Sequence, residues 1–95
     1  MKNEEVIRRG FRVVGRVQGV GFRWWTRRLA ERLGVVGWVR NCADGSVECE
    51  AKGAADVVEQ LRVELERGPT HARVDAVDCA ELEVERDGQG FEVRR

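Results

Sequence analysis

Hydrophobic and polar residues alternate over several stretches of the chain in the way that half-buried strands require. Residues 6–17 are rich in β-branched side chains and predict a first strand. Residues 35–53 alternate in two arms around Asp44 and Gly45, and an Asp-Gly pair between alternating arms is a strong signal for a β-hairpin. A long strand is then predicted over residues 72–85.

The end of the chain carries two further features of strand structure. The apolar phase of the long strand slips between Val77 and Ala80, which predicts a β-bulge there. Residues 87–90 contain two glycines and an aspartate, so we expect a turn that leads into a short final strand over residues 91–95.

Two other stretches have the spacing of amphipathic helices. The first helix is predicted over residues 22–33 and ends at Gly34, and the second over residues 54–66, ended by Gly68 and Pro69. Apolar residues recur along them at intervals of three and four: Phe22, Trp25, Leu29 and Leu33 in the first, and Val57, Val58, Leu61 and Leu65 in the second.

The order of these elements predicts an α+β fold, a ferredoxin-like βαββαβ sandwich with an antiparallel sheet and two helices on one face. In this topology the first two strands run parallel with the third between them. The loop after the first strand and the end of the second therefore open on the same edge, about 10 Å apart. We expect residues 15–23 to face Asn41 across a small crevice at that edge.

Composition limits the classes of function. The 95 residues predict a single domain over 1–95, with residues 1–5 as a flexible tail. Seventeen basic residues balance 17 acidic ones, so no overall charge favours nucleic acid or an anionic membrane as a partner. The N-terminus has no apolar run typical of a signal peptide or a membrane span, and three cysteines without metal-like spacing suit a reducing compartment. We therefore expect a cytoplasmic protein, and a monomer.

The segment between the first strand and the first helix is unusually rich in glycine. Gly15, Gly19 and Gly21 permit unusual backbone angles, so that successive N–H groups can point into one concavity at the positive end of a helix. Arg23 adds a planar guanidinium suited to two oxygens of one phosphate. The alternative is an ordinary glycine-containing turn. The pattern matches neither GxGxxG nor the P-loop, so it suits one phosphoryl group rather than a triphosphate.

Asn41 is one of only two asparagines and lies near the end of a predicted strand, where asparagine is disfavoured. Its side-chain amide can both donate and accept hydrogen bonds, so it can orient a water molecule against a bound phosphorus atom. The alternative is a residue that prepares the turn at Asp44 and Gly45.

The segments "GRVQGVGFR" and "GWVRNCADGSVE" resemble the two signatures of the acylphosphatase family, and the likeness covers nearly the whole chain. It implies a hydrolase that cleaves the carboxyl–phosphate bond of acyl phosphates. By this resemblance, Arg23 is the phosphate-binding arginine and Asn41 the water-positioning asparagine. Cys42 departs from the pattern, because some relatives carry threonine there. The resemblance assigns the phosphate-binding loop to Val17, Gln18, Gly19, Val20, Gly21 and Phe22.

The chemistry of an acyl phosphate fits so sparse a site. The leaving group is a carboxylate, which is stable without a proton, so neither a general acid, a metal nor a cofactor is required. Inorganic phosphate, the product, is expected to inhibit. The sequence leaves two alternatives open: a non-catalytic module that binds phosphate or a small ligand for regulation, and an RNA-binding module of the same topology. The second is disfavoured by the balanced charge and by a single aromatic residue in "RGFRVV".

Five other residues invite a functional interpretation. His71, the single histidine, is expected on the surface away from the crevice. Cys42 has no nucleophilic role in a family without a covalent step, and the strand phases of Cys49 and Cys79 predict burial. Trp24 either flanks the acyl group of the substrate or lies exposed beside the site.

Overall fold

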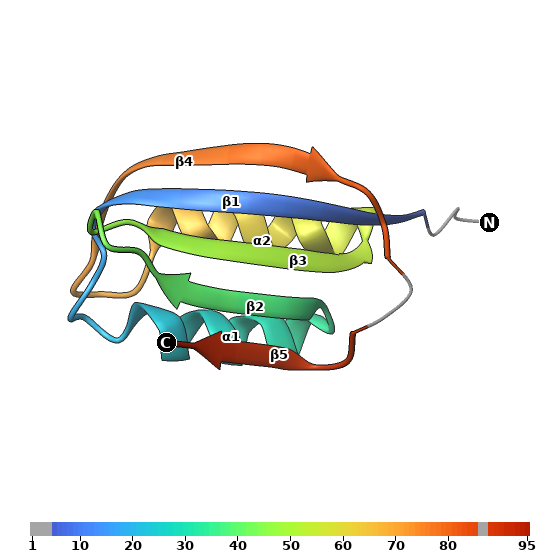
Figure 1. Cartoon of the computed structure of the whole chain (residues 1–95), viewed down its shortest axis with the longest axis horizontal. Helices are drawn as coiled ribbons and strands as arrows, with labels where there is room; N and C mark the ends of the chain where they lie inside the picture. Colours follow the sequence, from blue (N-terminus) through green and yellow to red (C-terminus); the bar gives the residue numbers. More distant parts are fainter. Residues whose placement is uncertain (1–4, 86–87) are drawn as a thin grey trace.

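The fold is a five-stranded sheet with both helices packed against one of its faces (Figure 1). It is seen in a computed structural model that describes residues 5–85 and 88–95. The elements follow one another as β1 (Val6–Arg16), α1 (Phe22–Leu33), β2 (Val36–Asn41), β3 (Val47–Ala54), α2 (Ala55–Arg67), β4 (Arg73–Leu82) and β5 (Phe91–Arg94).

The strand order β4-β1-β3-β2-β5 confirms the predicted arrangement of the first three strands. β3 pairs antiparallel with both β1 and β2, so β1 and β2 run in the same direction on either side of it. β5 pairs with β2 in parallel, so the sheet is mixed and the prediction of an antiparallel sheet is wrong at this edge. The reason is visible in Figure 1: β4 ends at the end of the sheet where β2 begins, and β5 begins there too, so β5 runs in the direction of β2.

The irregularity in β4 lies elsewhere than the sequence predicted. The pairing of β1 with β4 is continuous between Val77 and Ala80 and shifts at Gly15, where Asp75 is the extra residue of β4. Gly15 has a φ of 141°, and a Cβ built there would lie 2.2 Å from the carbonyl oxygen of Arg73. The bulge therefore depends on a close backbone approach that only glycine permits.

The helices lie within one residue of their predicted bounds. α1 begins and ends where its apolar spacing predicted, and Gly34 closes it in a left-handed conformation, with its N–H 2.9 Å from the carbonyl oxygen of Ala30. α2 begins and ends one residue later than predicted, and the backbone N–H of Gly68 bonds the carbonyl of Glu64 after its last turn.

The hydrophobic core lies between the two helices and the sheet face that they cover. Cys49 is buried in it as predicted, whereas Cys79 is exposed and the prediction of its burial is wrong. Cys79 pairs with the buried Phe11, but β4 is an edge strand and its phase alone does not bury it. The buried apolar residues are Phe11, Val13, Val17, Phe22, Leu29, Ala30, Val35, Val39, Val47, Cys49, Ala51, Val58, Leu61, Leu65 and Phe91.

The terminal segments bear on two predictions. Of the expected flexible tail, only Glu5 is described, and its carbonyl accepts a hydrogen bond of 2.9 Å from the N–H of Ala55. The other four tail residues lie outside the described residues, as does Asp87 of the expected turn; Gly88 and Gly90 have positive φ angles of 114° and 71°. In the described part of the chain no helix is long and apolar enough to cross a membrane.

Candidate active site

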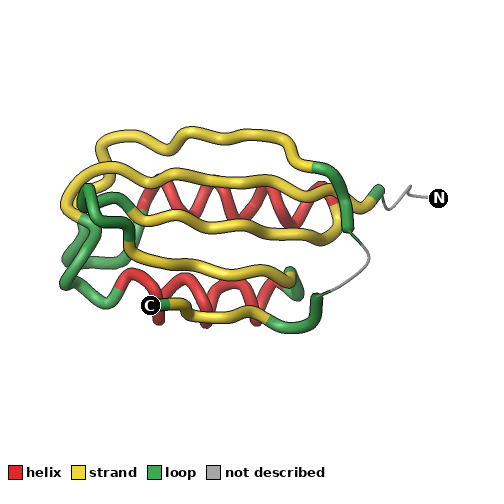
Figure 2. The backbone as a smooth tube through the Cα atoms, viewed as in Figure 1, coloured by secondary structure: helices red, strands yellow, loops and turns green. Residues whose placement is uncertain are grey.

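The loop after β1 and the hairpin after β2 lie at the same edge of the sheet, as the topology predicted (Figures 1 and 2). They are joined by one side chain. The amide nitrogen of Gln18 donates to the carbonyl oxygens of Cys42 at 2.8 Å and of Ser46 at 2.9 Å. The two segments that the topology predicted to face each other are therefore in direct contact through Gln18.

The loop over residues 17–21 presents mainly its backbone to solvent. Val17 and Phe22 are buried at its two ends, and Val20 packs against the core. Gly19 and Gly21 have φ angles of 76° and 78°, and a Cβ built at either position would meet nothing within 4 Å. Because the apolar side chains face inward while the left-handed glycines border open space, backbone N–H groups are the donors that this loop can offer to a ligand.

The first turn of α1 adds positive charge to this edge. Gly21 caps the helix, its carbonyl accepts the N–H of Trp25 at 3.0 Å, and the first turn holds no acidic residue. Arg23, in that turn, is half-buried, and its guanidinium donates a hydrogen bond of 2.9 Å to the carbonyl oxygen of Arg94 in β5. The unpaired N–H groups of a helix N-terminus and an arginine thus face the same edge.

Asn41 is the last residue of β2 and pairs with Val47 of β3. Because side chains alternate along a strand, Asn41 belongs to the same face as the buried Val39, which is the face that the helices cover. Its two chain neighbours are tied to the other parts of the edge. Cys42 accepts the bond from Gln18, and Arg40 pairs with Arg94, whose carbonyl holds Arg23.

The hairpin turn beside Asn41 is held by a carboxylate. Asp44 accepts hydrogen bonds from the hydroxyl of Ser46 at 2.6 Å and from its backbone N–H at 2.9 Å, and also pairs with Arg12. These contacts, the Ser46 hydroxyl first, lower the pKa of Asp44 to about 2. The turn is therefore most rigid when Asp44 is ionised.

The remaining candidate residues do not converge on the crevice. His71 is exposed as predicted, but the connection between α2 and β4 lies at the same edge rather than away from it (Figure 1). In this connection, a Cβ built at Gly68 would lie 3.4 Å from the ring of Phe22. Trp24 is 53% exposed, and the guanidinium of Arg27 lies 5.6 Å from its ring centre. Burial raises the pKa of the Cys49 thiol. Among the described residues, no three His, Cys, Asp or Glu side chains are grouped in a way that could hold a metal ion.

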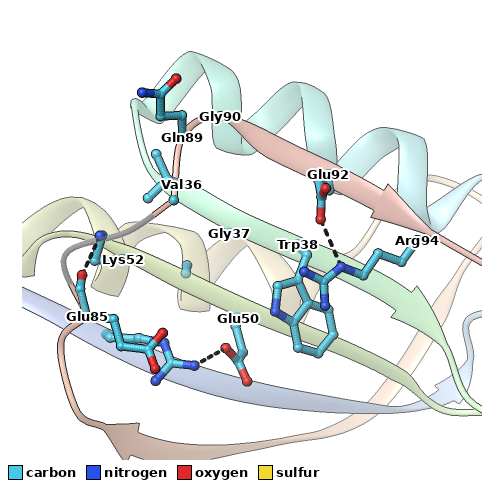
Figure 3. Close-up of a pocket in the computed structure, with 13 residues that line it drawn as sticks. Val36, Gly37, Trp38, Glu50, Lys52, Glu85, Gln89, Gly90, Glu92 and Arg94 are labelled. Carbon is cyan, nitrogen blue, oxygen red and sulfur yellow. Dashed lines mark hydrogen bonds and ion pairs between the residues drawn. The ribbon is translucent and has the colours of Figure 1, made fainter.

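Two cavities of about 370 and 380 Å³ lie on the other face of the sheet, and neither includes a residue of the loop or Asn41. Figure 3 shows the first, with Trp38 and the ion pairs of Glu50 and Glu92 on the side away from the helices. Two of the arginines that line the first cavity have carboxylate partners: Arg8 with Glu50 at 2.5 Å and Arg94 with Glu92 at 2.9 Å. We therefore place the candidate site at the sheet edge rather than in either cavity.

Comparison with known proteins identifies the family. The family model described as acylphosphatase matches residues 9–93. The chain is 52% identical to an acylphosphatase of Salinibacter ruber over 84 residues, or 88% of each chain. It is 43% identical to one of Bifidobacterium longum, over 99% of this chain and 98% of the relative. The solved structure of an acylphosphatase from Coxiella burnetii matches with a TM-score of 0.90 at 40% identity, covering 94% of this chain and 93% of that one.

The chain belongs to the acylphosphatase family. The predicted family and the ferredoxin-like fold are confirmed. As a member, the chain is a hydrolase of acyl phosphates, and neither a non-catalytic binding module nor an RNA-binding domain is favoured. The sequence did not reveal two contacts of this edge, those of Gln18 with the hairpin and of Arg23 with β5. Both involve backbone carbonyls, which carry no sequence signal.

The stability of this acylphosphatase should depend on pH through the carboxylate of Asp44 in the hairpin turn. Asp44 has a pKa of about 2 when folded, below its unfolded value. Its stabilising contribution is therefore complete above a pH of about 4 and is lost as the pH falls toward about 2. Asp44→Asn should lower the thermal unfolding midpoint at neutral pH, and this difference from the unsubstituted protein should shrink across that window. A difference that stays constant from neutral to acid pH would contradict the assignment. Ser46→Ala keeps the carboxylate of Asp44 but removes one of its hydrogen-bond donors, so the pKa of Asp44 should rise. The stabilising contribution of Asp44 should then be lost at a higher pH.

Proposed function

We propose that the backbone of residues 17–22 and the guanidinium of Arg23 bind the phosphoryl group of an acyl phosphate, and that Asn41 orients the attacking water. The observation that supports this most directly is the set of contacts around Asn41. The residue after it is bonded to Gln18 of the loop, and the residue before it pairs with Arg94, which accepts from Arg23. Asn41 is thus linked to the loop through Cys42 and Gln18. It is linked to Arg23 through Arg40 and Arg94.

The electrostatics of α1 favour an anion at this position. A positive side chain in the first turn of a helix is locally unfavourable, because it adds to the positive end of the helix dipole. Arg23 lies there with no acidic residue in the same turn. A bound phosphoryl group, carrying up to two negative charges, satisfies both the arginine and the exposed N–H groups.

The reaction asks little more of the protein than position and positive charge. The oxygen of water attacks phosphorus, the bond between phosphorus and the acyl oxygen breaks, and its electron pair leaves with the carboxylate. The proton of the water passes to a phosphate oxygen or to solvent. Arg23 and the loop N–H groups stabilise charge on the equatorial oxygens, while Asn41 holds the water in line. We expect this chemistry to need no metal and no cofactor.

Three further properties belong to the proposal. Because all the groups named come from one chain, the protein is proposed to act as a monomer. The three cysteines are free thiols, which suits a reducing cytoplasm. Inorganic phosphate is expected to compete with the substrate, because it satisfies the same loop and arginine.

The role of Arg23 can be tested with benzoyl phosphate in the presence of a chelator. Arg23→Lys keeps the charge but loses the two-pronged guanidinium, and we expect its kcat/KM to fall by about 100-fold. Arg23→Ala should lose about 1000-fold, while both variants remain folded by circular dichroism. Arg28→Ala, at an exposed position of the same helix, is the matched control and should be fully active.

Near-normal turnover by Arg23→Ala would point to another arginine, such as Arg16. The metal-free mechanism would be contradicted if the unsubstituted protein lost its activity in the chelator and regained it only with added magnesium.

The role of Asn41 can be separated from binding. Asn41→Ala leaves the loop and Arg23 in place, so inorganic phosphate should bind within about twofold of its affinity for the unsubstituted protein. The water loses the group that fixes its approach, and kcat should fall by about 100-fold or more. Calorimetric titration with phosphate beside a rate measurement on the same folded protein checks both. If affinity and rate fall together, Asn41 belongs to the binding groups; if neither changes, it is only a turn residue.

A further inference from the structure

Gln18 makes a contact that phosphate binding by the loop does not explain. Its amide nitrogen lies 2.8 and 2.9 Å from the carbonyl oxygens of Cys42 and Ser46, in the hairpin rather than in the loop. A primary amide nitrogen carries two hydrogens, so each carbonyl accepts one of them. One side chain thus closes the gap between the loop and the β2–β3 hairpin.

The hairpin offers these two carbonyls from a well-fixed turn. The N–H of Cys42 donates to the carbonyl of Ser46 at 2.8 Å, and the N–H of Gly45 donates to the carbonyl of Cys42 at 3.1 Å. Ser46 is buried and is bonded to the carboxylate of Asp44 by both its hydroxyl and its N–H. The acceptors of Gln18 are therefore held in place by hydrogen bonds within the hairpin itself.

The loop is anchored to the core by the buried residues at its ends and by Val20, which packs against the core between them. Val17 and Phe22 are both buried, so the chain enters and leaves the loop from the core. Between them the two left-handed glycines border open space. The side chain of Gln18 connects this segment to the hairpin. One of its acceptors is the carbonyl of Cys42, the residue next to Asn41.

The contact of Gln18 with the hairpin bears on the distance between the loop and Asn41, and the proposed reaction depends on this distance. A water molecule in line with the breaking bond must be held correctly relative to the phosphorus atom, and a misplacement of about 1 Å costs about 100-fold in rate. The loop determines where the phosphorus lies, and the end of β2 determines where the amide of Asn41 lies. Gln18 connects these two parts.

We propose that Gln18 is a positioning residue for the hydrolysis, which sets the distance between the phosphate-binding loop and Asn41 by donating both amide hydrogens to the hairpin. The proposal rests on the roles given above to the loop and to Asn41. The side chain of Gln18 acts through Asn41 rather than on the substrate, because its amide nitrogen is occupied by the two carbonyls. It accounts for a glutamine at this position: glutamate would place a carboxylate oxygen against two carbonyl oxygens, and asparagine is one methylene too short to reach both.

The experiment compares Gln18→Met with Gln60→Met, a matched change at an exposed position of α2. Methionine keeps the length of the side chain and removes its donors. We expect kcat for benzoyl phosphate to fall by about 10- to 100-fold, while calorimetry shows phosphate affinity within about threefold of the unsubstituted protein. Gln60→Met should change neither. Gln18→Asn, which keeps an amide at this position, is expected to lose kcat in the same way and carries the test if Gln18→Met does not fold.

The decisive readout is a double substitution. If Gln18 acts by placing Asn41, its contribution disappears once the Asn41 side chain is absent. Gln18→Met in the Asn41→Ala background should then lower kcat by less than about threefold further. The proposal is overturned if Gln18→Met alone keeps kcat within about twofold, if phosphate affinity falls together with kcat, or if its cost is the same with and without the Asn41 side chain. A fully active Asn41→Ala single variant would overturn the role of Asn41 itself and the Gln18 proposal with it, so the two failures are told apart by that variant alone.

Discussion

β1 and β2 end at the same edge of the sheet because β3 lies between them and runs antiparallel to both. Every group of the proposed site depends on this constraint. It places the end of β2 beside the loop that follows β1 and the N-terminus of α1, although Asn41 lies about 20 residues after them in the sequence. It also places the β2–β3 hairpin against the loop, where Gln18 bonds it. β5 then pairs with β2, and its Arg94 accepts a hydrogen bond from Arg23.

Local patterns were sufficient to predict most of the elements. Helical spacing and a closing glycine gave the bounds of α1, and the Asp-Gly pair gave the hairpin, because both signals act over a few residues. The resemblance of two motifs identified the family. The edge shared by residues 15–23 and Asn41 followed from the order of the elements alone.

Long-range features were not predictable in this way. The parallel pairing of β5 with β2 depends on where the chain returns after β4, and Cys79 is exposed because β4 is an edge strand rather than because of its phase. The bulge is set by the approach of Gly15 to β4, whereas the slip in apolar phase near Val77 is a feature of the sequence without a change in register. The contacts of Gln18 and Arg23 end on backbone carbonyls, so no pattern of side chains indicates them.

The proposed site lies at the edge of the sheet, whereas the two cavities lie on the face away from the helices, where Trp38 and paired charges line them. The groups proposed for the site suit a ligand recognised by one small, highly charged group. Backbone N–H groups and one guanidinium are enough to bind a phosphoryl group, and nothing in that set selects the acyl part of the substrate.

The most direct test of the account is a titration of the ¹⁵N-labelled protein with inorganic phosphate, followed by NMR. We expect the backbone amide signals of residues 18–23 and the side-chain amide of Asn41 to shift together along one saturation curve, while the indole signal of Trp38 does not move. Shifts that gather around Trp38 on the open face of the sheet, with the loop signals unchanged, would contradict it.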